Sequence, residues 1–530
     1  MTNSLEELEN EAKCIFIIGS NTSENHPVIS MKIKKNVRKN GARLIVADPR
    51  KIDLADLADV HMRQSPGSDV ALLNAMMNVI INEGLADNEF IAEHTEGYEA
   101  MKEVVARYTP ESLENITGVP AETIRRAARI FAQSEAAVIC YAMGLTQHRT
   151  GTDNVKSVCN LALLTGNIGR PGTGVDPLRG QNNVQGACDM GCLPNVYTAY
   201  QQVSNEAVRA KFAGAWQVSL PDNNGLMLTE IIAKAHEGEI KSLYVIGENP
   251  LLSDPDTNHT KEALKNLDFL VVQDIFLTET AALADVVLPG ASFAEKDGTF
   301  TNTERRVQRI RKAVSPPGKA KADWEIISGL AARMGYEMAY RSAEEIFEEI
   351  RILTPSYAGI SYSRIERTGI QWPCPDENHM GTKILHKVGN FSRGKGAFMP
   401  VEFILPGELP DPNYPLILTT GRNLFHYHTG TMTRRSQALN EYVPNAELEI
   451  NPALAAKLNI SAGETVKIST RRGSLEIAAK ITERVAPQVV FMTFHFAETA
   501  ANLLTGGEFL DPVAKIPEYK VSAARIDKIT

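Results

Sequence analysis

The sequence has no long apolar run and no excess of positive charge. No hydrophobic stretch reaches the roughly 18 residues that a membrane-spanning helix needs, so we expect no direct membrane insertion. Lysine and arginine number 55 against 64 aspartate and glutamate, a formal net charge of −9, which argues against a nucleic-acid partner. The 43% hydrophobic content over 530 residues is ample for several large cores.

Cysteine is also scarce, and no two of the six cysteines form a CxxC pair. Cys188 and Cys192 lie four residues apart and could be half of a metal site, but no second pair completes it. We interpret all six as ordinary thiols of a reducing compartment and expect a cytoplasmic location. The acidic start, MTNSLEELENEAK, lacks the basic and apolar regions of a signal peptide and predicts one short helix before a strand.

The GxGxxG fingerprint of nicotinamide and flavin enzymes is absent. The first 290 residues instead alternate short β-branched runs with amphipathic helices, which is typical of parallel α/β sheets. We expect helices at Asp69–Glu83 and Ala121–Gln133. Strands are expected at Cys14–Gly19, Arg43–Asp48, Ala137–Ala142, Ser242–Gly247, Phe269–Asp274 and Asp285–Leu288.

The sequence changes character near residue 400. Residues 373–400, rich in Gly, Pro, Lys and Asn, indicate a connecting segment. Val466 and Ile468 then alternate with Lys467 and Ser469, as in half-buried β structure. We predict two α/β domains, 1–181 and 182–400, and a β-rich domain, 401–530. Strands of the last domain are expected at Tyr414–Thr420, Thr465–Thr470, Ser474–Ile481 and Val489–Phe496.

Ligands of open α/β sheets bind beyond the carboxyl ends of the strands. Glycine there lets backbone approach a diphosphate, and a carboxylate such as Asp48 can accept from ribose hydroxyls or guanine N–H groups. Each such motif alone is typical of a simple turn or cap, so only their joint order is informative. In strand order, the candidates are Asn21, Asp48, Arg50, Gly144, Gln147, Gly247 and Glu248.

Residues 177–191, PLRGQNNVQGACDMG, are too polar and too glycine-rich for a core. The amide of Gln181 and its neighbours offer paired donors and acceptors, and the guanidinium of Arg179 suits bidentate capture of a small carboxylate. A solvated loop is the alternative interpretation. The stretch closely resembles the pterin- and substrate-facing loop of molybdenum formate dehydrogenases, in the dimethyl-sulfoxide-reductase family.

The resemblance covers essentially the whole chain and is closest to formate dehydrogenase catalytic subunits among molybdopterin oxidoreductases. It implies parallel-sheet α/β domains that bind nucleotide, followed by a C-terminal β-barrel. It also implies a bis(molybdopterin guanine dinucleotide) cofactor with molybdenum or tungsten. The segments that carry it are IIGSN, VADPRK, LLTGNIGRPGTGV, PLRGQNNVQGACDMG, YVIGENP, QDIFLTETAALADVVLP, EKDGTFTNTERR and LTTGRNLFHYHTGTMTRR.

Individual roles follow from the same resemblance. Arg179 corresponds to the catalytic arginine that orients formate, and Gln181 to a neighbour of the pterin; the strand-end candidates match positions lining the nucleotide sites. For His426 and His428 a pair of surface-loop histidines is the alternative interpretation. The cofactor-binding positions implied in the last domain are Arg422, His426, Thr429, Thr431, Asn502 and Lys520.

Two parts expected of the family have no counterpart here: the four-cysteine site of a 4Fe–4S cluster and the cysteine or selenocysteine that ligates the metal. Cys14 cannot replace that ligand because it falls in the first expected strand. We therefore expect both upstream of Met1, with a selenocysteine UGA codon read as a stop. An artificial boundary, proteolysis or a split subunit are alternatives. The chain alone should then be inactive and expose an apolar patch over its first sheet.

The expected reaction is oxidation of formate to carbon dioxide, or its reverse, with electrons passing to partner subunits that carry iron–sulfur clusters or flavin. Within the same fold, a nitrate reductase or a formylmethanofuran dehydrogenase is an alternative. A non-catalytic scaffold subunit of the same fold is a further alternative, and the presence of Arg179 and Gln181 argues against it.

Overall fold

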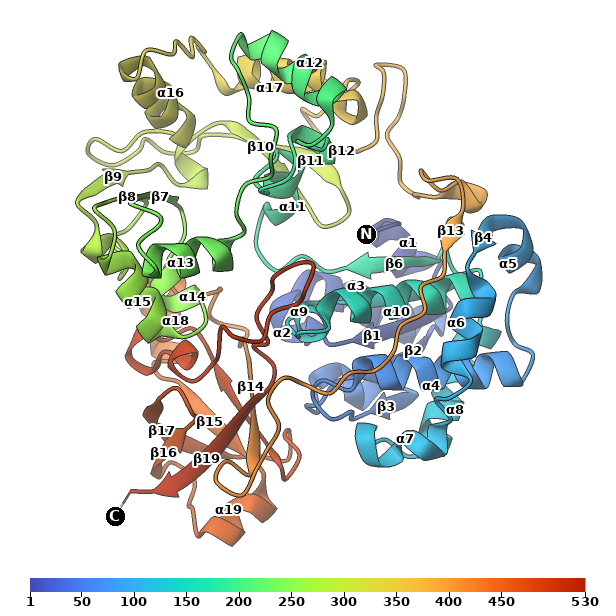
Figure 1. Cartoon of the computed structure of the whole chain (residues 1–530). Coiled ribbons are helices and arrows are strands. Elements are labelled where there is room, and N and C mark those ends of the chain that lie inside the picture. The colour runs from blue at the N-terminus through green and yellow to red at the C-terminus, as the bar shows by residue number, and fades with distance from the viewer. Residues whose placement is uncertain (530) are drawn as a thin grey trace. The chain divides into compact units, whose positions relative to one another are not determined.

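The computed structural model describes residues 1–529 and, at residue 388, only the backbone (Figure 1). Its contacts divide the chain into two compact units. Unit 1 comprises Met1–Gly180, Leu252–Thr257 and everything described from Ile384 onward, and unit 2 comprises Gln181–Leu251 and Asn258–Lys383. The division into three domains stays a prediction.

Unit 1 contains a five-stranded parallel sheet of order β3-β2-β1-β5-β6. The three strands expected here are confirmed, each ending one residue earlier than predicted. The run CIFII of β1 is apolar throughout because it is buried on both faces: Phe16 and Ile18 belong to one core, Ile15 and Ile17 to another. The strands are β1 (Cys14–Ile18), β2 (Arg43–Ala47), β3 (Val60–Met62), β5 (Ala137–Tyr141) and β6 (Gly174–Pro177).

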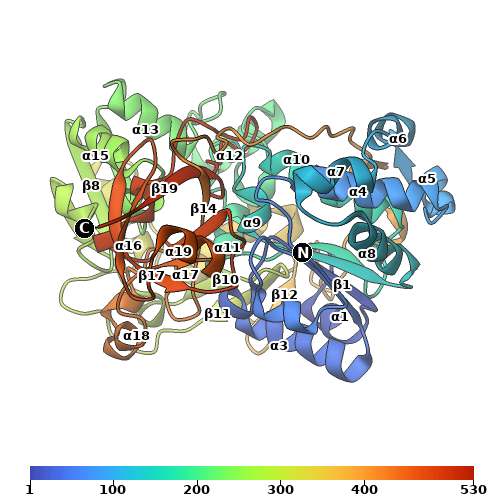
Figure 2. The same ribbon diagram turned by 90° about the horizontal axis from the view of Figure 1, so that it is seen from below.

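Helices cover both faces of this sheet. α4 (Asp69–Asn82), α8 (Ala121–Gln133) and α10 (Gly151–Leu164) share a core with Phe16, and α1 (Leu5–Asn10) and α3 (Pro27–Lys35) share one with Ile15. Figure 2 shows β1 between these two layers. The expected apolar patch over the first sheet is therefore wrong, since all of β1 is buried. Other elements are α2 (Thr22–Asn25), α5 (Asn88–His94), α6 (Tyr98–Val105), α7 (Pro110–Thr117), α9 (Met143–Thr146), and the paired β4 (Thr95–Glu96) and β13 (Gly396–Ala397).

The C-terminal part of unit 1 is a closed barrel of order β14-β18-β15-β17-β16-β19, which confirms the implied fold. Val466 and Ile468 face its core while Lys467 is exposed, as the alternation predicts. Ser469, expected on the same face as Lys467, is buried instead. Residues 471–473 make the turn between β16 and β17. The elements are β14 (Leu416–Gly421), α18 (Gln437–Tyr442), β15 (Glu447–Ile450), α19 (Pro452–Leu458), β16 (Thr465–Ser469), β17 (Ser474–Ile481), β18 (Val489–Thr493) and β19 (Ser522–Lys528).

Unit 2 holds a parallel sheet of order β7-β8-β9 and an antiparallel sheet of order β10-β11-β12. Among the described residues, no helix is both long and apolar enough to cross a membrane. The strands are β7 (Ser242–Ile246), β8 (Phe269–Asp274), β9 (Val286–Pro289), β10 (Gly298–Thr301), β11 (Arg306–Ile310) and β12 (Ile370–Gln371). The helices are α11 (Val184–Asp189), α12 (Glu206–Trp216), α13 (Leu228–His236), α15 (Thr257–Lys265), α16 (Asp323–Arg333) and α17 (Ala343–Leu353).

Candidate cofactor site

The loops that follow β1 and β5 touch each other at two glycines. The Gly144 N–H donates to the Gly19 carbonyl at 3.0 Å. A Cβ on Gly19 would lie 2.4 Å from the Leu145 nitrogen, and one on Gly144 would lie 2.5 Å from the Gly19 oxygen. Both positions therefore exclude any side chain. Because the strand order reverses between β1 and β5, this contact marks the place where open α/β sheets bind ligands.

Beside the glycine contact lies a buried amide without a protein partner. The Asn21 side chain is 8% exposed, and neither its oxygen nor its nitrogen makes a hydrogen bond. The Nδ1 atom of His26, five residues later, is likewise unpartnered, while its Nε2 donates to the Arg179 carbonyl at 2.9 Å. Buried polar groups are almost always paired, so the two side chains indicate a polar ligand at this point.

Two oppositely charged groups are buried near the end of β2. Burial raises the pKa of Asp48 to about 6, and its carboxylate accepts the Arg50 N–H at 2.9 Å. Burial, and then the charge of Arg422, lower the pKa of Lys520 to about 7. The Lys520 ammonium donates to the Thr420 carbonyl at 2.8 Å. A bound anion would stabilise the charged form of Lys520.

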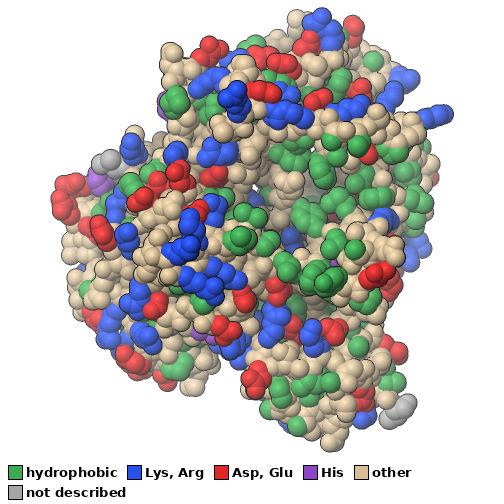
Figure 3. All heavy atoms as spheres, turned by 180° about the vertical axis from the view of Figure 1, so that it is seen from behind, with side chains coloured by type: hydrophobic (Ala, Val, Ile, Leu, Met, Phe, Trp, Pro, Cys, Tyr) green, Lys and Arg blue, Asp and Glu red, His purple; other side chains and the backbone are tan. Residues whose placement is uncertain are grey.

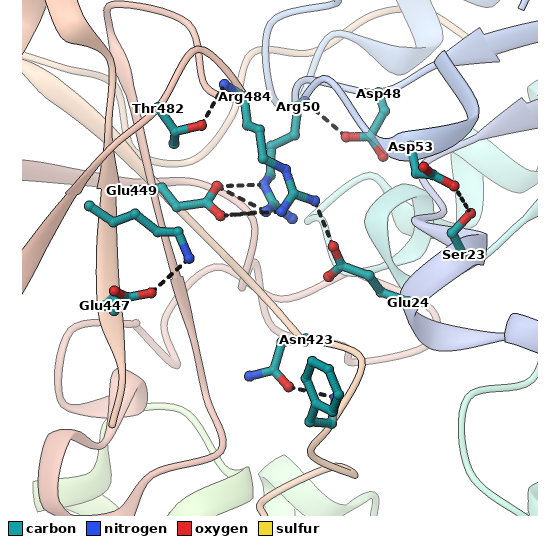
Figure 4. A network of polar contacts seen from close by, with 12 residues as sticks. Ser23, Glu24, Asp48, Arg50, Asp53, Asn423, Glu447, Glu449, Thr482 and Arg484 are labelled. Carbon is teal, nitrogen blue, oxygen red and sulfur yellow. Dashed lines mark hydrogen bonds and ion pairs between the residues drawn. The ribbon is translucent and has the colours of Figure 1, made fainter. Parts of the chain in front are cut away.

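Arg50 is held by the barrel (Figure 4). Its Nη2 lies 3.0 and 2.9 Å from the two carboxylate oxygens of Glu449, and its guanidinium stacks 3.5 Å over the ring of Phe491. Arg484 reaches Glu24 at 2.6 Å and Glu449 at 3.7 Å. This network fastens the α/β region to the barrel. It gives Arg50 a structural role beside its predicted contact with the cofactor, which stays a prediction.

The loop after β14 brings a second cluster of positive and neutral donors. Arg422 donates to the Gly180 carbonyl at 3.4 Å and forms no ion pair with a carboxylate among residues 1–529. Burial lowers the pKa of His428 to about 4 and that of His495 to about 3, so both rings are neutral at pH 7. His495 Nε2 accepts the Asn423 N–H at 2.9 Å, so its Nδ1 carries the proton and donates to the His428 carbonyl.

His426 is buried and uses both ring nitrogens inside the loop. Its Nε2 donates to the Val443 carbonyl at 2.8 Å, and its Nδ1 lies 3.2 Å from the Thr433 hydroxyl. The hydroxyls of Thr429 and Thr431 lie 3.0 Å apart. The surface-loop interpretation of His426 is therefore wrong, and its geometry is that of a residue that fixes the loop.

Asn502 is also fully engaged within unit 1. Its amide donates to the carbonyls of Leu252 and Ser253 at 2.8 and 3.0 Å, and its oxygen accepts from Thr505 at 2.9 Å. These bonds hold the segment Leu252–Thr257, which belongs to unit 1 although unit 2 precedes and follows it in sequence, against the barrel region. Its cofactor contact stays a prediction.

The remaining candidates fall on either side of the unit boundary. Arg179 follows β6, and its side chain is exposed in unit 1. Gln181, Gly247 and Glu248 belong to unit 2, where Gly247 has a φ of 64° and follows β7. Asn21, Asp48, Gly144, Arg422 and Lys520 all belong to unit 1, where the charges of Arg422 and Asp48 act on Lys520. Gln147 belongs to the same unit and directly follows α9.

Sequence reasoning missed a buried acid–base cluster next to Gln147. His148 lies 3.8 Å from a carboxylate oxygen of Asp69 and 3.9 Å from one of Glu518, and all three are at most 4% exposed. Its Nε2 contacts the Gly144 carbonyl at 3.0 Å. The only sequence signal was the position of His148 directly after a strand-end motif, because Glu518 lies 370 residues away in sequence.

Comparison with known proteins also indicates a cofactor-binding protein. Residues 1–333 match the family model of molybdopterin oxidoreductases, and residues 416–523 match that of the molydopterin dinucleotide binding domain. The chain is 54% identical over its whole length to the F420-dependent formate dehydrogenase subunit alpha of Methanocaldococcus jannaschii, covering 78% of that protein. It is 42% identical over its whole length to formate dehydrogenase H of Escherichia coli, covering 74% of it.

A solved structure supports the fold. Acetylene hydratase from Pelobacter acetylenicus superimposes with a TM-score of 0.76 at 22% identity, over all of this chain and 81% of the hydratase. The two family models, the full-length relatives and the strand-end geometry agree: this chain belongs to the molybdopterin oxidoreductase family.

Proposed function

We propose that this chain forms the greater part of a formate dehydrogenase catalytic subunit, which oxidises formate to carbon dioxide or runs the reverse reaction. The observation that carries the proposal is the 54% identity, over the whole chain, to a protein named as a formate dehydrogenase subunit alpha. The relatives at 52% and 51% identity, both from Methanococcus maripaludis, have names of the same kind.

The proposed cofactor is bis(molybdopterin guanine dinucleotide) with molybdenum or tungsten, and the residues of unit 1 fit such a group. Asn21 offers an unpartnered buried amide, Lys520 and Arg422 offer positive charge suited to a diphosphate, and Asp48 offers an acceptor for guanine or ribose. When bound, this group supplies the metal centre that takes two electrons from the C–H bond of formate.

Arg179 is proposed to bind the carboxylate of formate. Its side chain is exposed in unit 1, and its guanidinium presents two parallel N–H donors suited to a carboxylate. His26 donates to the Arg179 carbonyl, which fixes the backbone from which the side chain extends. Gln181 is proposed to contact the pterin.

The metal ligand and the 4Fe–4S site are proposed to lie on polypeptide outside these 530 residues. A cysteine that ligates the metal binds as a thiolate, and burial disfavours that form at Cys14 and Cys159 by raising their pKa to about 12 and about 11. The DNA upstream of the Met1 codon tests this: we expect a UGA or Cys codon followed by a His codon, and four cysteine codons further upstream. An in-frame UAA in that interval would contradict it.

Electrons are proposed to leave through partner subunits that carry iron–sulfur clusters or flavin, in the cytoplasm. Three relatives above 50% identity are named as F420-dependent, so F420 is the first acceptor to test with the assembled enzyme. Reduction of nitrate, or oxidation of formylmethanofuran, in place of formate oxidation would favour the alternative enzymes of the same fold.

The decisive experiment is Arg179→Lys in the intact enzyme. A lysine cannot reproduce the two-pronged contact, and losing a charge-assisted hydrogen bond costs about 1.5–3 kcal/mol, so kcat/KM for formate should fall roughly 10- to 150-fold. Metal and pterin content should stay unchanged, whereas Arg422→Ala should lower cofactor content. Arg341→Lys, on a side chain that is 88% exposed, is the control. Wild-type kinetics in Arg179→Lys would remove Arg179 from substrate binding.

A further inference from the structure

The loop at residues 177–191, which carries Arg179 and Gln181, also contains a buried carboxylate. Asp189 is the last residue of α11, and its side chain is 0% exposed. Acidic side chains usually lie at the surface, as those coloured red in Figure 3 do. A negative charge at the C-terminal end of a helix is also disfavoured by the helix dipole. The position is therefore unfavourable for a carboxylate unless its contacts offset the cost.

Four neutral donors surround the Asp189 carboxylate. Its Oδ1 accepts the side-chain amide of Gln185 at 2.8 Å and the hydroxyl of Tyr200 at 3.0 Å. Its Oδ2 accepts the hydroxyl of Tyr357 at 2.6 Å and the indole N–H of Trp372 at 2.7 Å. Burial raises the pKa of Asp189, and these four hydrogen bonds oppose that rise. The carboxylate is thus held by the geometry of its donors, none of which carries a positive charge.

These donors tie α11 to segments of unit 2 that are distant in sequence. Tyr357 and Trp372 lie 168 and 183 residues after Asp189, and both pack in one core with residues of α17 and β11. Tyr200 reaches the carboxylate from a strained turn, since Ala199 and Tyr200 have φ values of 52° and 61°. Backbone strain of this kind persists only where the surrounding contacts enforce it, and it is common at functional sites.

The start of α11 is attached separately. Asn183 precedes the helix with a φ of 62°, and its side-chain oxygen accepts the Thr301 N–H of β10 at 2.9 Å. A Cβ on Gly186 would lie 2.1 Å from that oxygen, so a side chain there would displace the contact. The Gln181 carbonyl accepts the Val184 N–H at 3.4 Å, which makes Gln181 part of the turn that leads into the helix. α11 is therefore held at both of its ends.

We propose that Asp189 is a positioning residue: its carboxylate fixes α11 and thereby sets the place of Gln181 and of the backbone that joins Gln181 to Arg179. The inference rests on the proposed function, in which Gln181 contacts the pterin and Arg179 binds formate. Asp189 acts through α11 and not by a contact of its own with either ligand. Groups that bind substrate or cofactor must be held within about 0.5 Å of the productive geometry, and a helix held at both ends provides that precision.

The test compares two substitutions of Asp189 in the intact enzyme. Asp189→Ala removes every acceptor, whereas Asp189→Asn keeps one oxygen that accepts from two donors. With metal and pterin content measured in each preparation, KM for formate should rise at least about tenfold in Asp189→Ala, because the groups that bind formate and pterin are no longer held in place. The rise should be smaller in Asp189→Asn. Hydrogen exchange of residues 181–191, measured in the 530-residue chain, should quicken in the same order.

Ile232→Ala is the matched control, because Ile232 is 5% exposed in a different core of unit 2, which α13 shares with α15 and β8. It should lower the melting temperature as Asp189→Ala does, but leave KM and the exchange of residues 181–191 unchanged. Tyr357→Phe removes one donor and keeps the ring in its core. It should raise KM in the wild-type background and add nothing to Asp189→Ala, where the hydroxyl has already lost its partner.

A wild-type KM in folded, fully loaded Asp189→Ala enzyme would overturn the proposal, even if that variant melts at a lower temperature. If Asp189→Ala does not fold, a wild-type KM in Asp189→Asn would overturn it. An equal rise of KM in Ile232→Ala would do so too, because KM would then follow the stability of unit 2. If the wild-type enzyme does not oxidise formate, the proposed function fails, and the exchange of residues 181–191 still tests the hold of Asp189 on α11. The two failures are therefore distinguishable.

Discussion

The two parallel sheets of this protein share a sequence pattern and differ in burial. β1 in unit 1 is apolar throughout, and β8 in unit 2 is apolar from Phe269 to Val272 before it ends in Gln273 and Asp274. Every residue of β1 is buried, whereas β8 begins with Phe269 at 45% exposure. The difference shows that an apolar strand sequence alone does not determine burial. Whether such a strand is buried depends on the helices and strands that pack against it.

The sharpest test of this comparison substitutes one phenylalanine in each sheet. Phe16→Ala should lower the free energy of unfolding by about 3–5 kcal/mol, because the ring is fully buried and packs edge-on against Phe131. Phe269→Ala should cost less than about 1 kcal/mol. All three tryptophans, Trp216, Trp324 and Trp372, lie in unit 2, so their fluorescence follows that unit while circular dichroism follows both. Equal losses would mean that the Phe269 side chain is covered in solution.

A second comparison uses two glutamates of the same strand, β15. Glu449→Gln should destabilise unit 1 by about 3 kcal/mol, because it leaves the guanidinium of Arg50 buried without its counter-charge. Glu447→Gln should cost less than about 1 kcal/mol, since its partner Lys480 and the glutamate itself are each 48% exposed. Chemical denaturation measures both. A small effect at Glu449 would show that water reaches the network in Figure 4.

A smaller, pH-dependent effect should come from Lys520. Its folded pKa of about 7 lies below the ordinary 10.5, so between these pH values the unfolded chain binds more protons. The free energy of unfolding should therefore rise with pH in this window, by at most about 1.4 kcal/mol per pH unit from this group. Lys520→Met should lose that slope, and Lys528→Met, at a half-exposed position of β19, should keep it. Equal slopes in all three proteins would contradict the assigned pKa.

The sequence was enough to place the strands that end at the cofactor site. Cys14–Ile18 and Ala137–Tyr141 are continuous apolar runs followed by glycine-containing loops, and such local signals need no knowledge of the partner strand. β15 and β19 were missed because ELEI and SAARIDK carry charges whose burial or exposure depends on distant strands. The interpretation of Arg50 was incomplete for the same reason: Glu449 is 399 residues away.

The residues implied by family resemblance divide in a similar way. Asn21 is buried without a hydrogen-bond partner, and burial shifts the pKa of Asp48 and of Lys520 toward their neutral forms. A bound dinucleotide would supply polar partners to all three side chains. His426 and Asn502 are satisfied by the protein itself. A motif records that a position matters, but only the hydrogen-bond partners distinguish a ligand contact from a support.

The sequence separation between Arg50 and Glu449 also determines when their contact can form during translation. At about 5–20 residues per second, a ribosome needs roughly 20–80 seconds to travel from one to the other. During that interval Arg50 has been translated and Glu449 has not. The Arg50 side chain therefore stays hydrated until its carboxylate partner is made. The last strand to be made, β19, closes the barrel next to β14 and β16. The contact that fastens the first sheet to the barrel therefore forms only after Glu449 has been translated.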